Sequence, residues 1–202
     1  MSKRSLQRAY DLWAPIYDRA VVGFSRGPRA ANIAEIPSTA KTILVVGVGT
    51  GLDLPLLPPQ ALSVALDISW AMLSRARNRA VTAQLLQADA ENLPMASATC
   101  DVVLLHLILA VVPHAEQALA EASRVLRPGG TLLIFDKFLR PGQRAPLRRL
   151  LAPLSGAVAT RTDLVFEELL RQHPELELES DLPAAVGGWF RRLRLQRREV
   201  PS

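Results

Sequence analysis

Three glycines within five residues follow directly on a short apolar segment, and this feature constrains the fold more than any other. The apolar segment is Thr42–Val46, and the turn at residues 47–51 reads GVGTG. Glycine has no Cβ, so it adopts positive φ angles without a clash and lets the backbone pass close to a ligand. A strand that enters such a turn is typical of an open α/β sheet, in which ligands bind beyond the carboxyl ends of the strands.

Short apolar segments alternate with helical ones through the middle of the chain. Their Val, Ile and Leu residues occupy both faces, which predicts a parallel sheet covered by helices on both sides. The predicted strands are Thr42–Val46, Ser63–Asp67, Ala83–Ala88, Asp101–Leu107 and Thr131–Asp136, and the predicted helices between them are Trp70–Ala80 and Glu116–Leu126. The expected fold is therefore an open, doubly wound, Rossmann-like α/β sheet.

The two ends of the chain differ from this alternating core. Apolar and aromatic residues at helical spacing predict an N-terminal helical extension over residues 1–36, bent or divided at Pro15. After the core, helices are predicted at Pro146–Leu154 and Asp163–Gln172, and late strands at Glu175–Glu179 and Trp189–Leu195, with an antiparallel edge as one option. We interpret the chain as one domain with a helical cap (1–36), a core (37–136) and an outer part (137–202).

Length and composition place the chain among ordinary globular proteins. Its 202 residues suit one domain, and 49% hydrophobic against 21% charged residues excludes disorder as the main state. The single cysteine, Cys100, allows no internal disulfide and no cysteine-based zinc site, which points to a reducing compartment. No apolar run reaches the about 20 residues of a membrane span, and no secretory signal is expected. These features together predict a cytoplasmic protein.

Basic residues gather in three segments, and the net charge of the chain is +5. The segments are 1–30, 137–161 and 189–198, and in the last one Trp189 and Phe190 precede five arginines. Basic clusters mixed with aromatic residues can dock on an anionic membrane surface or on nucleic-acid phosphates. They can also be ordinary solvated helix faces, and charge alone leaves the three interpretations open.

A carboxylate follows each of the next two predicted strands. Asp67 lies 20 residues beyond Gly47, where it can accept hydrogen bonds from both hydroxyls of an adenosine ribose, and Asp89 can reach the adenine edge. The glycine spacing is G-x-G-x-G and not the G-x-G-x-x-G of dinucleotide sites. No Tyr-x-x-x-Lys pair is present in the sequence either, so a nicotinamide cofactor is disfavoured.

The ordered set of motifs resembles the class I S-adenosylmethionine-dependent methyltransferases. The matching segments are ILVVGVGTG (43–51), LDISxxML (66–73, where x is any residue), DAENLP (89–94) and ASRVLRPGG (122–130). The resemblance implies a seven-stranded sheet in the order 3-2-1-4-5-7-6 with an antiparallel seventh strand, and S-adenosylmethionine as methyl donor. It also implies that Asp67 holds the ribose, that Asp89 holds the adenine amine, and that the glycine turn passes the methionine portion. The full set of implied donor contacts is Gly47, Val48, Gly49, Gly51, Asp67, Ile68, Met72, Asp89, Ala90 and His106.

One position departs from the pattern of that family. Two residues before the first glycine, the family usually carries an acid that organises the turn and helps to hold the amino group of the donor. This chain has Val45 there, and Asp53 or a backbone carbonyl is a candidate substitute. No metal is expected at the site.

Methyl transfer depends on an aligned, dry pocket more than on a nucleophile of the protein, but the acceptor must lose a proton. His106, at the carboxyl end of the fourth strand, is the leading candidate for the base, with packing at a strand end as the alternative. Tyr10 and Tyr17 on the N-terminal helix are further catalytic candidates, with core packing as their alternative. His114 follows Pro113 and is interpreted as a surface or cap residue.

Two subfamilies match in finer detail. The opening YDLWAPIYD (10–18) resembles quinone-biosynthesis C-methyltransferases, whereas VGVGTGLDLPL (46–56) and AVVP (110–113) resemble bacterial phosphatidylethanolamine N-methyltransferases. The resemblance implies a small-molecule or lipid acceptor and peripheral contact with an anionic membrane. The favoured function is methylation of a phospholipid amine. Methylation of a quinone or of a soluble small molecule, and a non-catalytic binding module, stay as alternatives, and nucleic acid is not an expected partner.

Overall fold

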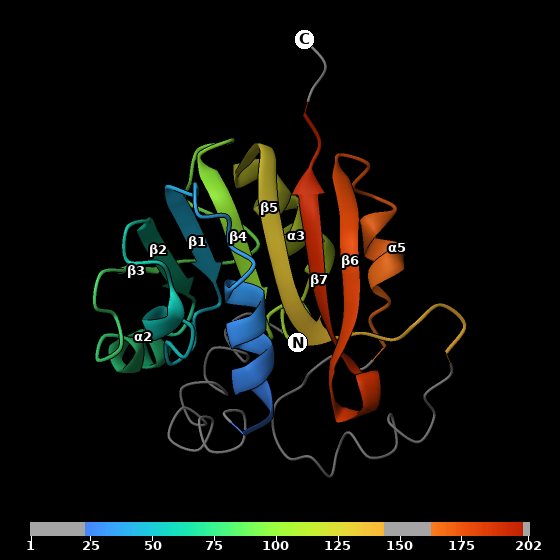
Figure 1. Cartoon of the computed structure of the whole chain (residues 1–202), viewed down its shortest axis with the longest axis horizontal. Coiled ribbons are helices and arrows are strands. Elements are labelled where there is room, and N and C mark those ends of the chain that lie inside the picture. The colour runs from blue at the N-terminus through green and yellow to red at the C-terminus, as the bar shows by residue number, and fades with distance from the viewer. Residues whose placement is uncertain (1–22, 144–162, 200–202) are drawn as a thin grey trace.

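A seven-stranded sheet forms the centre of the computed structural model, which describes residues 23–143 and 163–199. The strands are β1 (Thr42–Val46), β2 (Leu62–Asp67), β3 (Gln84–Gln87), β4 (Cys100–His106), β5 (Leu126–Lys137), β6 (Leu176–Ala185) and β7 (Phe190–Arg197). In space they follow the order β3-β2-β1-β4-β5-β7-β6 (Figure 1). The first five strands pair in parallel, and β7 pairs antiparallel with both β5 and β6. The predicted Rossmann-like sheet with an antiparallel seventh strand is confirmed.

Helices cover both faces of this sheet. They are a helix at residues 23–33, α2 (Trp70–Ala76), α3 (Ala115–Val125) and α5 (Phe166–Leu170), with the short 3-10 turns η1 (Leu54–Leu56) and η3 (Val186–Gly188). In Figure 1 the helix at 23–33 (blue) lies in front of the sheet and α3 lies behind it. Successive residues of a strand point to opposite faces, so Val103 and Leu105 of β4 join the core cluster of α3, whereas Val102 and Leu104 join the cluster of the other face.

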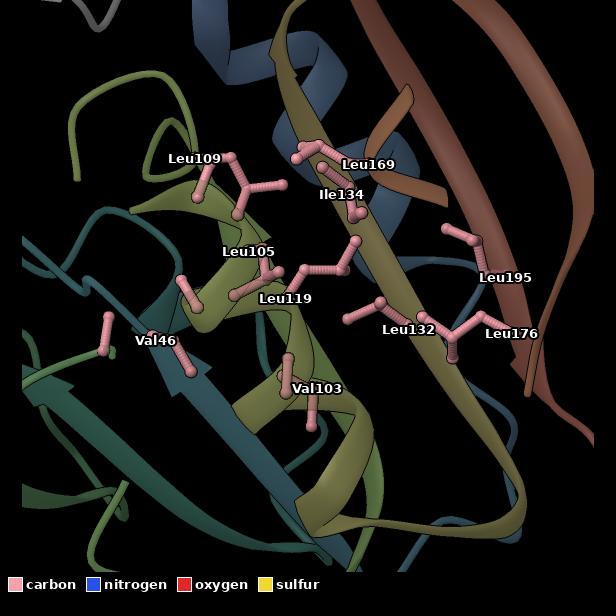
Figure 2. Close-up of a cluster of buried hydrophobic side chains, with 14 of the residues drawn as sticks. Val46, Val103, Leu105, Leu109, Leu119, Leu132, Ile134, Leu169, Leu176 and Leu195 are labelled. Atoms are coloured by element: carbon pink, nitrogen blue, oxygen red, sulfur yellow. The ribbon is translucent and has the colours of Figure 1, made fainter. Parts of the chain in front are cut away.

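One of these two core clusters fills the space between the sheet and α3 (Figure 2). Val46, Leu105 and Ile134 come from three neighbouring strands and face Leu119 of α3, and each is at most 1% exposed. Full burial of a Leu or Ile side chain contributes about 1.5–3 kcal/mol. The cluster therefore holds β1, β4 and β5 in register, and it brings the carboxyl ends of these parallel strands to one edge.

The boundaries within the parallel half of the sheet are close to those predicted. β1 has the predicted bounds, β2 starts one residue earlier, β3 is one residue shorter at each end, and β4 is shifted by one residue. The exception is β5, which starts at Leu126, five residues before the predicted Thr131. The helix α2 ends at Ala76 and not at Ala80, because the chain tightens there: the N–H of Arg79 donates to the carbonyl of Ala76 (2.8 Å), which is a three-residue turn.

The outer part of the chain differs more from the prediction. The strand β6 runs on to Ala185, well beyond the predicted end at Glu179, because Leu182 and Pro183 still pair with β7. A proline is tolerated there since β6 is the edge strand of the sheet. The helix predicted at Pro146–Leu154 lies outside the described residues. Within the described part of the chain, no helix is long and apolar enough to cross a membrane.

Candidate active site

A pocket opens at the carboxyl edge of the sheet, between the turn after β1, the ends of β2 and β3, and the segment after β4. Its volume is about 650 Å³ with the part that is open to solvent, which is within the range of small-molecule sites. Most of the lining side chains are apolar. The described residues around it are Gly47, Gly49, Leu66, Asp67, Ile68, Met72, Ala88, Asp89, Ala90, Leu107, Ile108, Val111, Val112 and Pro113. We call this cavity the donor pocket.

The glycine turn forms one wall of the donor pocket. Gly47 and Gly49 have φ angles of +69° and +57°, a backbone region that costs most other residues about 1–2 kcal/mol. A Cβ on Gly47 would lie 2.6 Å from Cδ1 of Ile108. The turn therefore lies directly against the segment that follows β4, and only glycine allows that close approach.

Asp67, at the end of β2, ties the glycine turn to the start of α2. One carboxylate oxygen accepts from the N–H of Gly49 (2.8 Å), and the other accepts from the N–H of Ser69 (2.9 Å). The hydroxyl of Ser69 in turn accepts from the N–H of Met72 (3.2 Å) and caps α2. Each carboxylate oxygen can accept more than one hydrogen bond, so this residue can orient the turn and receive ligand hydroxyls.

The turn after β3 forms a second polar corner of the donor pocket. The Asp89 carboxylate accepts from the N–H of Glu91 (2.9 Å), and the buried Glu91 carboxylate accepts from the N–H of His114 (2.8 Å). These bonds connect the end of β3 with the start of α3, whose N-cap position is His114. The structure thus places His114 at a helix start, as predicted, and fixes Asp89 and Ala90 beside the pocket.

The segment after β4 supplies the apolar wall opposite the strand ends, and the sequence reasoning missed most of it. Leu107 turns the chain with a φ of +60°, and its N–H donates to the carbonyl of Phe135 (2.7 Å). Ile108, Val111 and Val112 then line the pocket. The available signal was the apolar run that continues past the predicted strand end, which places hydrophobic side chains at the ligand edge of the sheet.

A buried carboxylate holds this apolar segment from behind. Asp136, 1% exposed at the end of β5, accepts from the N–H of Ala110 (3.1 Å) and from its neighbour Lys137 (2.8 Å). Burial raises the pKa of Asp136 to about 6, although these backbone N–H groups oppose the rise. The segment that lines the donor pocket is therefore held by a carboxyl group whose pKa is raised by burial.

His106, the predicted base, lies in a buried polar network beside the pocket and not among its lining residues. Its Nδ1 is 3.0 Å from Oδ1 of Asp53, and its Nε2 is 3.2 Å from Nδ2 of Asn32. The other oxygen of Asp53 accepts from Arg29 (2.6 Å). We call these four residues, His106, Asp53, Asn32 and Arg29, the buried network; each is at most 5% exposed.

The neighbours of Asn32 fix the tautomer of His106. Nδ2 of Asn32 donates to the carbonyl of Ile134 (3.0 Å), and its Oδ1 accepts from Nε of Arg192 (2.8 Å), so the amide cannot be turned round. Nε2 of His106 must then accept from Asn32, and Nδ1–H donates to Asp53. A proton can be taken up at Nε2 only if the bond to Asn32 breaks, so the geometry favours a positioning role for His106 over that of a base.

Asp53 belongs to the buried network and not to the donor pocket. Burial by itself would raise the pKa of Asp53, but the neighbouring His106 and Arg29 outweigh burial and hold this pKa well below its usual range. Both of its oxygens are engaged by these two partners. Its position does not support Asp53 as the substitute for the missing acid at Val45, which is itself a buried core residue.

The predicted donor contacts fall into two groups. Those that line the donor pocket are Gly47, Gly49, Asp67, Ile68, Met72, Asp89 and Ala90. The structure does not bring the other three there: Val48 packs in the core, Gly51 lies against Ala76, and His106 lies in the buried network. Tyr10 and Tyr17 lie outside the described residues.

The arginines of the last basic segment are used within the fold. Arg191 is fully buried, and its guanidinium donates to Asp181 (3.0 and 2.7 Å) and to Glu167 (2.7 Å). Arg197 donates to backbone carbonyls, and the acidic partners of the whole segment are Glu35, Glu167, Glu177, Glu179 and Asp181. This segment is consequently part of the β6–β7 packing, and the expectation of a membrane surface there has no support from its contacts.

The donor pocket fits a ligand that carries adenosine. Asp67 can receive ribose hydroxyls and Asp89 an exocyclic amine, because ionised carboxylates only accept hydrogen bonds. Ile68, Val111 and Val112 offer apolar walls for a flat base, and the bare glycine turn leaves room for a chain beside it. These residues can hold S-adenosylmethionine.

Comparison with known proteins agrees with this geometry. A family model described as a methyltransferase domain matches residues 44–134, the stretch that contains the glycine turn, Asp67 and Asp89. A phosphatidylethanolamine N-methyltransferase of Cereibacter sphaeroides is 34% identical over 205 residues, which are 98% of this chain and 100% of that protein.

Two further comparisons cover less of the sequence or show only the fold. A ubiquinone/menaquinone biosynthesis C-methyltransferase of Syntrophotalea carbinolica is 36% identical over 139 residues, which are 63% of this chain and 59% of that protein. The crystal structure of an S-adenosylmethionine-dependent methyltransferase of Thermotoga maritima has a TM-score of 0.72 at 20% identity, over 95% of this chain and 99% of that one. At that identity the likeness is one of fold.

Proposed function

This chain belongs to the class I S-adenosylmethionine-dependent methyltransferases, and we propose that its acceptor is the amine of a phospholipid, phosphatidylethanolamine above all. The observation that carries the proposal is the Cereibacter sphaeroides relative, whose similarity extends over 98% of this chain. The quinone methyltransferase matches 63% of it. Donor motifs do not encode the acceptor, so similarity outside residues 44–134 bears more directly on the acceptor than similarity within them.

The chain contributes alignment and exclusion of water. Bound S-adenosylmethionine supplies a methyl group on a positively charged sulfur. In this proposal Asp67 and the glycine turn hold the donor in one orientation, and the apolar residues Ile108 and Val111 keep water from the transferred group. Positioning of two reactants in this way supplies much of the rate of such a displacement.

The acceptor amine has to be neutral when it attacks, so its ammonium form must first lose a proton. In this proposal His106 does not take that proton directly, because its Nε2 accepts from Asn32 and the residue is only 2% exposed. His106 instead holds the carboxyl end of β4, from which the pocket wall at Leu107 starts. Tyr10 and Tyr17 stay proposed catalytic residues.

A quinone acceptor is the second candidate, and the 36% identity with a quinone C-methyltransferase favours it. The chain spans 59% of the length of that protein. The two candidates differ in the atom that is methylated, which is nitrogen in one and carbon in the other. Both acceptors reside in a bilayer, so peripheral contact with a membrane is part of either proposal.

The test uses the full chain, a donor with a labelled methyl group, and vesicles of phosphatidylethanolamine with or without phosphatidylglycerol. We expect label in mono- and dimethylated phosphatidylethanolamine, and more of it on the anionic vesicles. Asp67→Ala serves as the control that removes donor binding. Label in an added demethylquinone and not in the lipid would favour the second candidate, and label in neither would refute both.

A further inference from the structure

A second cavity lies on the other side of the glycine turn, among the helix at 23–33, the turn at 52–56 and the residues after α2. Its volume is about 770 Å³ with the part that is open to solvent. Three of the described residues around it are arginines (Arg26, Arg29 and Arg79), one is Ser25, three are apolar (Leu52, Pro55 and Leu56), and none is acidic. We call this cavity the arginine pocket.

The three arginines differ in their burial and in the hydrogen bonds that their guanidinium groups form within the protein. Arg29 is buried, and it donates Nη1 to Asp53 (2.6 Å) and Nε to Ser25 (3.3 Å), while Nη2 has no hydrogen-bond partner in the described part of the chain. Arg79 donates Nη1 to the carbonyl of Thr50 (2.6 Å). Arg26 is exposed and forms no ion pair with the residues that the structure describes. Of these three guanidinium groups, that of Arg29 contacts Asp53.

This composition fits one class of ligand, an anion that carries apolar substituents. Guanidinium groups bind phosphate oxygens in a bidentate manner, and they do so more tightly than neutral donors. The cavity is also lined by the apolar residues Leu52, Pro55 and Leu56, and Leu56 is 43% exposed. A phosphodiester with attached acyl chains carries both a charged and an apolar group. Its phosphate would face the arginines, and its carbon atoms would face Leu56.

The arginine pocket and the donor pocket are linked through residues at the carboxyl end of β4 and in the turn after β1. Gly49 lines the donor pocket and Leu52 the arginine pocket, so three residues of backbone separate them, or about 10 Å at most when extended. Arg29 contacts Asp53, and Asp53 contacts His106, whose next residue, Leu107, again lines the donor pocket. A ligand in one pocket is therefore close to a ligand in the other.

We propose that the arginine pocket is the subsite for the phosphate of the phospholipid acceptor, from which the two-carbon spacer of ethanolamine carries the amine toward the donor pocket. This inference rests on the proposed function for its substrate. It adds the residues that select a phosphorylated acceptor over a free amine or a quinone. Arg26 is the informative position, because it contributes charge and does not belong to the buried network.

Binding of a short-chain lipid tests the proposal without requiring methyl transfer. The full chain with S-adenosylhomocysteine is titrated by calorimetry with dihexanoyl phosphatidylethanolamine below its micelle concentration. Loss of one charge-assisted hydrogen bond should weaken binding about tenfold, so we expect Arg26→Gln and Arg79→Gln each to bind the lipid about tenfold more weakly. Arg77→Gln is the matched control, since Arg77 is exposed on the same segment and does not line either pocket.

The outcomes separate the subsite from the function. Wild-type affinity in both Arg26→Gln and Arg79→Gln overturns the subsite. Competition between inorganic phosphate and the lipid in the wild type supports the subsite. If the arginine variants lose phosphate binding but keep lipid binding, the pocket binds free phosphate, and the lipid assignment is overturned. If the wild type binds the lipid through the arginines but methylates no phosphatidylethanolamine, the proposed function fails and the subsite stands. If the double variant Arg26→Gln with Arg79→Gln methylates phosphatidylethanolamine normally, the subsite fails and the proposed function stands.

Discussion

Two carboxylates buried to the same degree lie at the same edge of the sheet, and burial has opposite outcomes for them. Asp53 and Asp136 are each 1% exposed. Burial raises the pKa of Asp136 to about 6, whereas His106 and Arg29 outweigh burial at Asp53 and hold its pKa well below the usual range. Loss of water disfavours the charged form of both carboxyl groups. The neighbouring side chains, and not the degree of burial, therefore decide whether the pKa is raised or lowered.

The two sides of the glycine turn also differ in the side chains that hold them in place. On the side of the buried network, two side chains from the helix at 23–33 hold the end of β4: Asn32 bonds to His106, and Arg29 pairs with Asp53, which also bonds to His106. On the side of the donor pocket, Asp136 holds the segment after β4 through backbone N–H groups. One side is thus held by an ion pair and by side-chain hydrogen bonds, and the other is a largely apolar wall held by one buried carboxyl group.

Asp53→Ala should cause the largest loss of stability. It leaves the buried Arg29 guanidinium without its carboxylate, and removal of one partner of a buried pair costs about 3–5 kcal/mol. Urea unfolding followed by circular dichroism measures the effect. Glu177→Gln is the matched control: the Arg198–Glu177 pair is 60% and 64% exposed, and exposed pairs contribute at most about 1 kcal/mol. Equal losses in the two variants would contradict the comparison.

The raised pKa of Asp136 should make the free energy of unfolding depend on pH. A carboxyl group whose pKa is higher in the folded than in the unfolded chain binds more protons when folded, so its contribution falls as the pH rises through that interval. With an unfolded pKa of about 3.9 and a folded one of about 6, the free energy of unfolding should fall by about 2 kcal/mol between pH 4 and 7 relative to Asp136→Asn. A constant difference between the two proteins would show that Asp136 does not titrate there.

Asp67→Ala should weaken donor binding more than any other single change in the donor pocket. It removes the acceptor of the Gly49 N–H and the proposed acceptor of the ribose hydroxyls. Hydrogen bonds to charged groups are worth about 1.5–3 kcal/mol, so the affinity for S-adenosylhomocysteine should fall about ten- to hundredfold by calorimetry. The affinity of Asp67→Asn, which keeps one acceptor oxygen, should lie between those of the wild type and of Asp67→Ala. Unchanged affinity in a folded Asp67→Ala protein would remove the proposed ribose contact.

Gly47→Ala should have a smaller effect on the same pocket. Its Cβ would meet Cδ1 of Ile108 at 2.6 Å, so the pocket wall has to move, and we expect a loss of donor affinity of about tenfold, or about 1.4 kcal/mol. Gly187→Ala is the control for backbone strain, because Gly187 has a φ of +62° and nothing within 4 Å of a Cβ. The double variant Gly47→Ala with Ile108→Ala should recover part of the affinity. No recovery would assign the loss to backbone strain alone.

Local patterns in the sequence predict the parallel half of this sheet well. The apolar segment Thr42–Val46 and the glycine turn after it are each confined to a few residues, and the structure returns β1 with the same bounds. The antiparallel half is predicted less closely. The length of β6 depends on pairing of Leu182 and Pro183 with β7, and no local pattern reports a pairing partner.

The same distinction holds in the site. Asp67 and Asp89 follow strands directly, so parallel packing alone brings them to one edge, and the sequence predicts them beside the pocket. His106 also ends a strand at that edge, yet its ring turns to Asp53 and Asn32. Asn32 lies 74 residues away in the chain, and no local motif marks it.

The sequence alone predicts where the parallel strands, the glycine turn and the carboxylates after the strands lie along the chain, because each of these features is set by residues a few positions apart. What each buried charge does depended on contacts between distant segments. The helix at 23–33 brings Arg29 to Asp53, and it is this meeting that keeps one carboxylate ionised, takes His106 away from the donor pocket and leaves an arginine-lined cavity on the other side of the turn. Desolvation and pairing are properties of a packed interior, so only the tertiary structure determined them.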